Sequence, residues 1–163
     1  MHQPLRSAVL ALSLAASSAC GGAQTSTENT ESGVRSLQES RALEVIREAA
    51  TDSGASVGEG FTAEVSDGPI DVDLRLGSTF GVEWVSAQDR ANSPTLPEPP
   101  TGGQLRIIAE PGGAQILILE SSSYRYDSRR ERVQAGATSA ADVEARLRRD
   151  LRDFLVYAGL SDG

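Results

Sequence analysis

The chain has 163 residues, with 23 acidic side chains against 15 basic ones and a formal net charge of −8. All 15 of those basic side chains are arginine, and the absence of lysine excludes mechanisms that need a lysine amine, including Schiff-base formation and P-loop phosphate binding. So acidic a chain is also a poor candidate for binding nucleic acid, because the affinity of a protein for nucleic acid comes mainly from basic side chains that neutralise phosphates.

The first 19 residues predict a secretory signal peptide. Residues 1–6 form a weakly basic start with Arg6 as its fixed charge, and residues 7–19 are uncharged and mostly apolar. This apolar stretch is shorter than the roughly 20 residues that a transmembrane helix needs. A basic start, a short apolar region and small residues at its end are typical of a cleaved signal peptide, so we expect residues 1–19 to be removed.

The end of this segment, Ser17-Ser18-Ala19-Cys20, resembles the lipobox of bacterial lipoproteins. In that family the cysteine receives a diacylglycerol, a dedicated peptidase cleaves before it, and the new amino terminus is usually acylated. Ser18 and Ala19 fit the motif, whereas Ser17 stands where the family prefers leucine. The resemblance implies lipidation at Cys20 and a membrane as partner through that anchor. With Gly21 and no aspartate after the cysteine, it implies the outer membrane in a host that has two.

A second cleavage site leaves an alternative open. Gly21-Gly22-Ala23 before Gln24 fits the general signal peptidase and would release a soluble secreted or periplasmic protein that starts at Gln24. In either case residues 20–33 hold no large apolar side chain. They therefore predict a flexible tether ahead of one domain over residues 34–163.

The domain is expected to begin with a helix over residues 34–53. Leu43, Ile46 and Ala50 recur at helical spacing, Ser32 is a candidate amino-terminal cap, and Gly54 stands where a helix-ending glycine belongs.

An alternating pattern follows, which is typical of strands. Apolar residues alternate with polar ones over residues 61–66 and 70–76, on either side of an Asp-Gly-Pro turn. This pattern predicts a β-hairpin with one apolar face and one solvent-exposed face. Residues 80–86 predict a third strand.

Two further strands are expected after a long connection. Residues 94–103 contain four prolines and two glycines, which predicts a stiff surface connection, with a polyproline-type docking segment as the alternative. Residues 104–110 and 114–120 predict strands, and the unbroken apolar residues 116–119 place the second of them centrally in the sheet.

Polar residues 121–137 predict a long loop, and this loop carries the candidate binding residues. Tyrosine and arginine are the side chains that most often anchor interfaces. A partner-binding surface would therefore use Tyr124, Arg125, Tyr126, Arg129 and Arg130. The alternative is a surface loop whose tyrosines fold back on the sheet edge.

The last element is a helix that ends at Gly159. Ser139 and Asp142 have the spacing of a capping box. An apolar stripe at helical spacing follows, formed by Val143, Leu147, Leu151, Phe154, Leu155 and Ala158. The predicted fold class is thus α+β: a two-layer sandwich with a mostly antiparallel five-stranded sheet, an N-terminal and a C-terminal helix, and the order αβββββα.

The residue inventory argues against common enzyme chemistry. His2 lies in the predicted signal peptide, and after Cys20 the chain has no histidine, cysteine or lysine. We therefore expect no catalytic residue, metal or cofactor. Asp71 and Asp73, with Glu64 nearby, form a candidate carboxylate pair for a cation or for glycosidic acid–base catalysis, against the commoner interpretation of a charged sheet face.

Three functions follow as expectations. The first is a non-enzymatic lipoprotein of the bacterial cell envelope that binds another envelope protein or supports an envelope complex. The second is a module that binds a small molecule or lipid in the same compartment. The third is a carboxylate-dependent enzyme acting on glycans.

Overall fold

The computed structural model describes residues 33–93, 96–99, 104–109, 113–128 and 138–161. The predicted signal peptide, Cys20 and residues 21–32 of the predicted tether lie outside the described residues. The described part of the chain is α+β, which confirms the predicted class. Its elements, in chain order, are β1 (Val34–Ser36), α1 (Glu39–Asp52), β2 (Val57–Val65), β3 (Gly68–Leu76), β4 (Phe80–Val85), α2 (Ala87–Asn92), β5 (Arg106–Ala109), β6 (Gln115–Glu120), η1 (the 3-10 helix Ser121–Ser123), β7 (Arg125–Asp127) and α3 (Ala140–Ala158).

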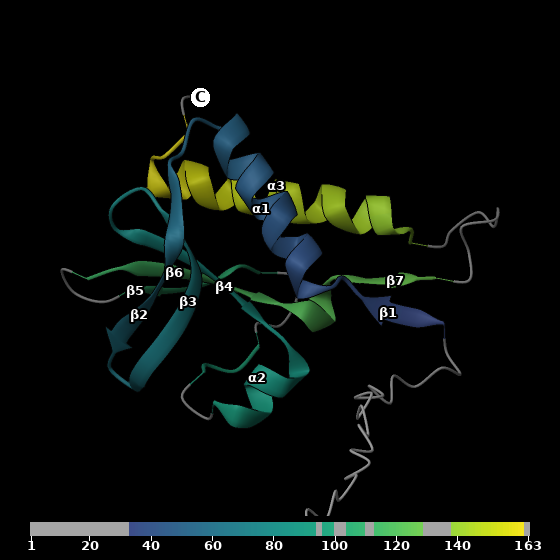
Figure 1. Cartoon of the computed structure of the whole chain (residues 1–163), viewed down its shortest axis with the longest axis horizontal. Coiled ribbons are helices and arrows are strands. Elements are labelled where there is room, and N and C mark those ends of the chain that lie inside the picture. Colours follow the sequence, from purple (N-terminus) through teal and green to yellow (C-terminus); the bar gives the residue numbers. More distant parts are fainter. Residues whose placement is uncertain (1–32, 94–95, 100–103, 110–112, 129–137, 162–163) are drawn as a thin grey trace, which may run out of the picture. The chain divides into compact units, whose positions relative to one another are not determined.

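A five-stranded sheet has the strand order β2-β3-β4-β6-β5 (Figure 1). The prediction of a mostly antiparallel sheet is wrong, because the sheet is mixed: β4 and β6 run parallel, whereas the other neighbours are antiparallel. After β4 the chain continues through α2 and the proline-rich connection to the sheet edge, forms β5 there, and returns as β6 beside β4. Two strands can pair in parallel only when the connection between them is long, and this one is.

The element order also differs from the predicted αβββββα. β1 precedes the first helix and pairs antiparallel with β7, with Val34 opposite Asp127, so α1 begins at Glu39. The short helix α2 lies between β4 and β5. It begins with a capping box, in which Ser86 Oγ accepts a hydrogen bond from the Asp89 backbone N–H at 3.2 Å and Asp89 Oδ2 accepts one from the Ser86 N–H at 2.9 Å.

The two long helices α1 and α3 pack together against one face of the sheet (Figure 1). The buried stripe of α3 agrees with the predicted one and consists of Val143, Leu147, Leu151, Phe154 and Leu155. Gly54 and Gly159 follow the two helices with φ of +81° and +66°, a left-handed backbone that favours glycine and confirms the predicted helix ends.

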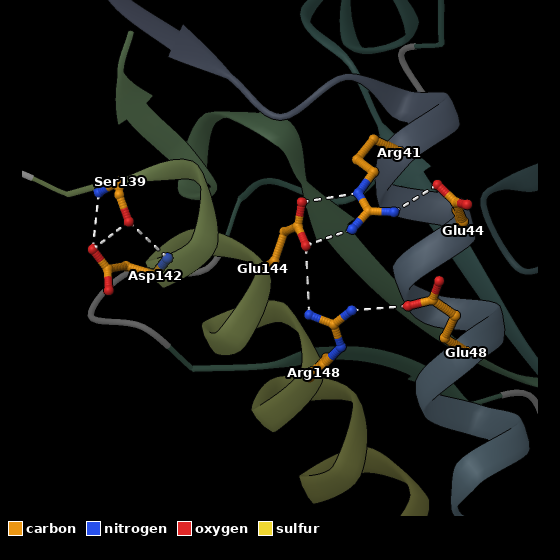
Figure 2. A network of polar contacts seen from close by, with 7 residues as sticks. All are labelled: Arg41, Glu44, Glu48, Ser139, Asp142, Glu144 and Arg148. Atoms are coloured by element: carbon orange, nitrogen blue, oxygen red, sulfur yellow. Dashed lines mark hydrogen bonds and ion pairs between the residues drawn. The ribbon is translucent and has the colours of Figure 1, made fainter. Parts of the chain in front are cut away.

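Ion pairs join α1 to α3 above this core (Figure 2). Arg41 donates two parallel hydrogen bonds to Glu144, from Nε at 2.8 Å and from Nη2 at 2.7 Å, and a third to Glu44. Arg148 bridges back to Glu48 at 2.8 Å. The Arg41 guanidinium lowers the pKa of the Glu144 carboxyl. Because most of these side chains are partly exposed, each pair is expected to stabilise the fold only modestly.

The capping box at the start of α3 supports a stability prediction. Ser139 Oγ accepts a hydrogen bond from the Asp142 backbone N–H at 3.1 Å (Figure 2). Replacing Ser139 with alanine leaves that N–H without its cap and should lower the free energy of unfolding by about 1 kcal/mol. Urea unfolding measures this loss, and Ser122→Ala, at an exposed position of η1, is the matched control. Equal midpoints for the two variants would show that the cap contributes nothing.

The opposite face of the sheet holds a second apolar cluster. Along β6, Leu117 and Leu119 belong to the core under the helices, whereas Ile116 and Ile118 belong to the second cluster. The second cluster also includes apolar residues of β2, β3, β4 and the proline-rich connection. The prediction that this face is exposed to solvent is therefore wrong where the cluster covers it.

Strand β3 contributes to both clusters because its side chains change face midway. Leu74 and Leu76 pack under the helices, whereas Ile70 and Val72 pack in the second cluster. Residues at even spacing lie on one face of a regular strand. The pairing of β2 with β3 skips Gly60 and keeps the same register on either side. On the turn side of Gly60, Phe61, Ala63 and Val65 pack in the second cluster.

Candidate functional site

Tyr124, the first residue of the predicted binding loop, is an anchor within the core. It follows η1 and is only 3 % exposed. Its hydroxyl donates to Asp150 Oδ2 on α3 at 2.9 Å, and its ring lies 5.3 Å from the Trp84 ring, centroid to centroid. Burial, with the Asp150 charge next, raises the pKa of the phenol, so it remains a neutral donor. This geometry matches the alternative in which the tyrosine folds back on the sheet.

The other predicted loop residues are dispersed. Arg125 is exposed on β7, and Tyr126 is half-buried against the main core. Arg129 and Arg130 lie outside the described residues. Their part in a partner-binding surface stays a prediction.

A groove of about 390 Å³ lies beside Tyr124. Arg146 and Arg149 of α3 line it together with Leu105, Ile118 and Tyr124. The Arg146 guanidinium lies over the Tyr124 ring, 5.1 Å from its centroid. The volume is within the range of small-molecule sites, about 300–1,000 Å³. Sequence reasoning missed this groove because both arginines lie off the apolar stripe that predicted the last helix.

A buried carboxyl pair forms a second cluster of polar groups. Glu83 of β4 is 9 % exposed, and its carboxyl is hydrogen-bonded to that of Asp73 on β3. Burial and the Asp73 charge raise the Glu83 pKa to about 9, so Glu83 is protonated at neutral pH and donates to the Asp73 carboxylate. Asp73 Oδ2 also accepts a hydrogen bond from the Trp84 backbone N–H at 2.7 Å.

Other charged groups surround this pair. The Asp89 charge on α2 raises the pKa values of Asp73 and Glu83. Glu39 of α1 is close enough to interact with Asp73, and Arg47 of α1 lowers the Asp73 pKa.

Among the described residues, no group of three or more histidine, cysteine, aspartate or glutamate side chains has a geometry that could hold a metal ion.

The predicted pair of Asp71 and Asp73 is divided between two environments. Asp71 is exposed and accepts a hydrogen bond from Thr62 Oγ1 at 2.9 Å across the hairpin. Asp73 is half-buried beside Glu83, and Glu64 is exposed on β2. A charged residue within an otherwise apolar strand, Glu83 in F-G-V-E-W-V, was the available signal for the buried pair.

Arg90 connects α2 to the proline-rich connection and to β6. Its Nη1 donates to the carbonyl oxygens of Leu96 at 3.0 Å and Pro97 at 2.5 Å, and its Nη2 pairs with the buried Glu120. These contacts hold the start of the connection and neutralise the Glu120 charge.

Comparison with protein-family models, curated proteins and solved structures finds no match to this chain. Within the described ranges, no helix combines the length and the apolar character needed to cross a membrane.

Proposed function

We propose that this chain is a lipid-anchored protein of the bacterial cell envelope whose α+β domain binds another envelope protein without catalysis. The observation that carries the proposal is Cys20 at the end of a short apolar segment, ahead of a tether without large apolar residues. A diacylglyceryl and an acyl chain together exceed the two signals that stable membrane anchoring requires. The outer membrane is the proposed location in a host with two membranes.

The state of the carboxylates argues against catalysis of the glycosidase type. After Cys20 the chain has no histidine, cysteine or lysine, so acid–base catalysis would fall mainly to carboxylates. Asp73 and Glu83 are in direct hydrogen-bond contact and occupied with each other and with the backbone. Glycosidases separate their two carboxyl groups by about 5 Å or more, with substrate or water between them.

Surface residues suited to a protein interface are present on α3 and β7. Val156 and Tyr157 on α3 are 67 % and 61 % exposed, and Arg125 on β7 is exposed as well. Tyrosine and arginine are enriched among the residues that dominate binding energies at interfaces.

The intact mass of the protein from a detergent-solubilised membrane fraction tests the anchor. We expect a chain that begins at Cys20 and is heavier by a diacylglyceryl and an acyl group, and a Cys20→Ala variant without this added mass that leaves the membrane fraction. An unmodified chain that begins near Gln24 in the soluble fraction would overturn the lipoprotein assignment. That result would indicate an exported protein that diffuses freely.

Site-specific crosslinking tests the protein partner separately. A photo-crosslinking residue at position 125 should give a discrete adduct with another envelope protein in intact cells. The matched position is 47, an exposed arginine on α1. Adducts of equal yield at both positions would indicate random contact.

The groove beside Tyr124 favours small-molecule binding as a second candidate function. Its volume of about 390 Å³ is within the range of ligand sites, and two arginines and a tyrosine among its lining residues could orient a bound molecule.

A further inference from the structure

We propose that the groove beside Tyr124 binds a small molecule that carries a carboxylate or a phosphate on an apolar body. The inference rests on the second candidate function and names its ligand class. It does not depend on the lipid anchor, because the residues that carry it belong to the domain and not to the tether.

The positive charge of the groove comes from one face of α3. Arg146 and Arg149 are three residues apart, so their side chains are neighbours on the helix surface. Both line the groove. A guanidinium offers several N–H donors in one plane and binds carboxylate or phosphate through two parallel hydrogen bonds.

Arg146 is positioned in advance of binding. Its guanidinium lies 5.1 Å from the centroid of the Tyr124 ring, and that ring is fixed by Trp84 and by the hydrogen bond to Asp150. Stacking on an aromatic ring restrains a side chain that is otherwise flexible, which lowers the entropy cost of binding. No carboxylate of the described residues is within ion-pair distance of Arg146. The Arg149 Nε is 3.9 Å from Asp150 Oδ1, at the outer limit for an ion pair.

The two carboxylates that line the groove are already engaged. Asp150 Oδ2 accepts the Tyr124 hydroxyl at 2.9 Å, and Glu120 pairs with Arg90. The Glu120 charge is neutralised by Arg90, whereas Asp150 accepts a hydrogen bond from a neutral phenol and keeps its charge. Among the described lining residues, two arginines therefore face one uncompensated carboxylate. The arginines give the groove a local preference for an anion although the whole chain carries a charge of −8.

The apolar part of the ligand would contact Leu105. This residue precedes β5, is half-buried and lines the groove, whereas the Ile118 side chain packs in the second cluster. A ligand that joins a charged head to a short hydrocarbon body fits both halves of this lining better than a bare ion does.

Trp84 provides a built-in reporter for the test. It is the only tryptophan of the chain, and its ring lies 5.3 Å from that of Tyr124. We would titrate the purified full chain carrying Cys20→Ala with octanoate, octyl phosphate, octylamine and inorganic phosphate, and follow tryptophan fluorescence. Saturable binding of octanoate or octyl phosphate, at least tenfold tighter than that of octylamine, is the expected result. The tighter of the two anions identifies the head group.

Variants decide whether the arginines are responsible. Arg146→Gln should weaken binding of the preferred anion by about tenfold or more, because a charge-assisted hydrogen-bond pair is lost. Arg152→Gln, at an exposed position on the same helix outside the groove, should leave the affinity unchanged. If Arg146→Gln does not fold, Arg149→Gln gives the same comparison.

The proposal is overturned by any of three results. These are no saturable response to either octyl anion at millimolar concentration, equal affinity for octylamine, or an equal loss of affinity in Arg152→Gln. A negative result here leaves the mass and location of the protein unaffected. The lipoprotein assignment and the ligand site therefore fail independently.

Discussion

Replacing Glu83 with glutamine should stabilise the protein at neutral and alkaline pH and remove most of its pH dependence between about pH 5 and pH 9. Glu83 is 9 % exposed, and burial, with Asp73 as the next cause, raises its pKa to about 9. A glutamine amide has nearly the same shape and donates a hydrogen bond to the Asp73 carboxylate as protonated Glu83 does. The variant thus keeps the hydrogen bond to Asp73 but no longer has a group at position 83 that gains or loses a proton.

The direction of the pH dependence follows from the two states. In the unfolded chain Glu83 loses its proton near its ordinary pKa of about 4.3. The folded chain keeps the proton until the pH approaches about 9. Between these values only the folded state holds it, so the free energy of unfolding falls as the pH rises, by at most about 1.4 kcal/mol per pH unit. Above about pH 9 both states are ionised and the fall ends.

Urea unfolding in steps between about pH 5 and pH 9 measures this effect in the wild type and in Glu83→Gln. A smaller fall of the same sign should remain at the acidic end in the variant, because burial also raises the pKa of Asp73. Glu64→Gln, at an exposed position on β2, is the matched control and should reproduce the wild-type slope. Parallel curves for wild type and Glu83→Gln would show that Glu83 ionises normally in the folded protein.

Local patterns in the sequence predicted the elements that depend on neighbouring residues. The hairpin, the stripe of α3, its capping box and the glycines after both long helices all follow from spacing within one element. The missed helix α2 has a capping box at Ser86 but buries none of its residues. It therefore lacks the apolar periodicity by which a helix is recognised.

The order of strands depends on contacts between distant segments. The residue patterns of β4 and β6 indicate strands, but neither pattern specifies that the two strands pair in parallel or that β5 lies at the edge of the sheet.

The groove beside Tyr124 also depends on contacts between segments that are distant in the sequence. Tyr124 and Arg146 come together because Tyr124 packs against α3, where its hydroxyl donates to Asp150. The order of residues in the loop does not predict this contact.

The carboxyl pair also depends on a distant contact. The alternation of apolar and polar residues predicted that Asp71 and Asp73 lie on the same charged face of the sheet. The change of face within β3 instead brings Asp73 to the Trp84 backbone and to Glu83. At this point Gly60 of the neighbouring strand lies directly against the β3 backbone.

Replacing Gly60 with alanine should lower the free energy of unfolding by about 3 kcal/mol. A Cβ atom at this position would lie 2.3 Å from the Val72 carbonyl oxygen and 2.9 Å from that of Asp73. Both contacts are with backbone, which cannot rotate away as a side chain does, so β3 itself has to move. Gly58→Ala is the matched control on the same strand, since its Cβ would be 3.6 Å from the Arg75 Cβ, an ordinary contact. Its expected change is within about 0.5 kcal/mol.

The Gly60→Ala variant should also alter the pH dependence of stability, which separates the proposed cause from a general loss of packing. If β3 moves at Asp73, the hydrogen bond to Glu83 weakens and water reaches the pair, so the Glu83 pKa falls towards its ordinary value. The slope between about pH 5 and pH 9 should then decrease in Gly60→Ala and stay at the wild-type value in Gly58→Ala. A destabilised Gly60→Ala variant with the full wild-type slope would mean that the hairpin yields elsewhere and that the carboxyl pair does not depend on the close approach of the two strands.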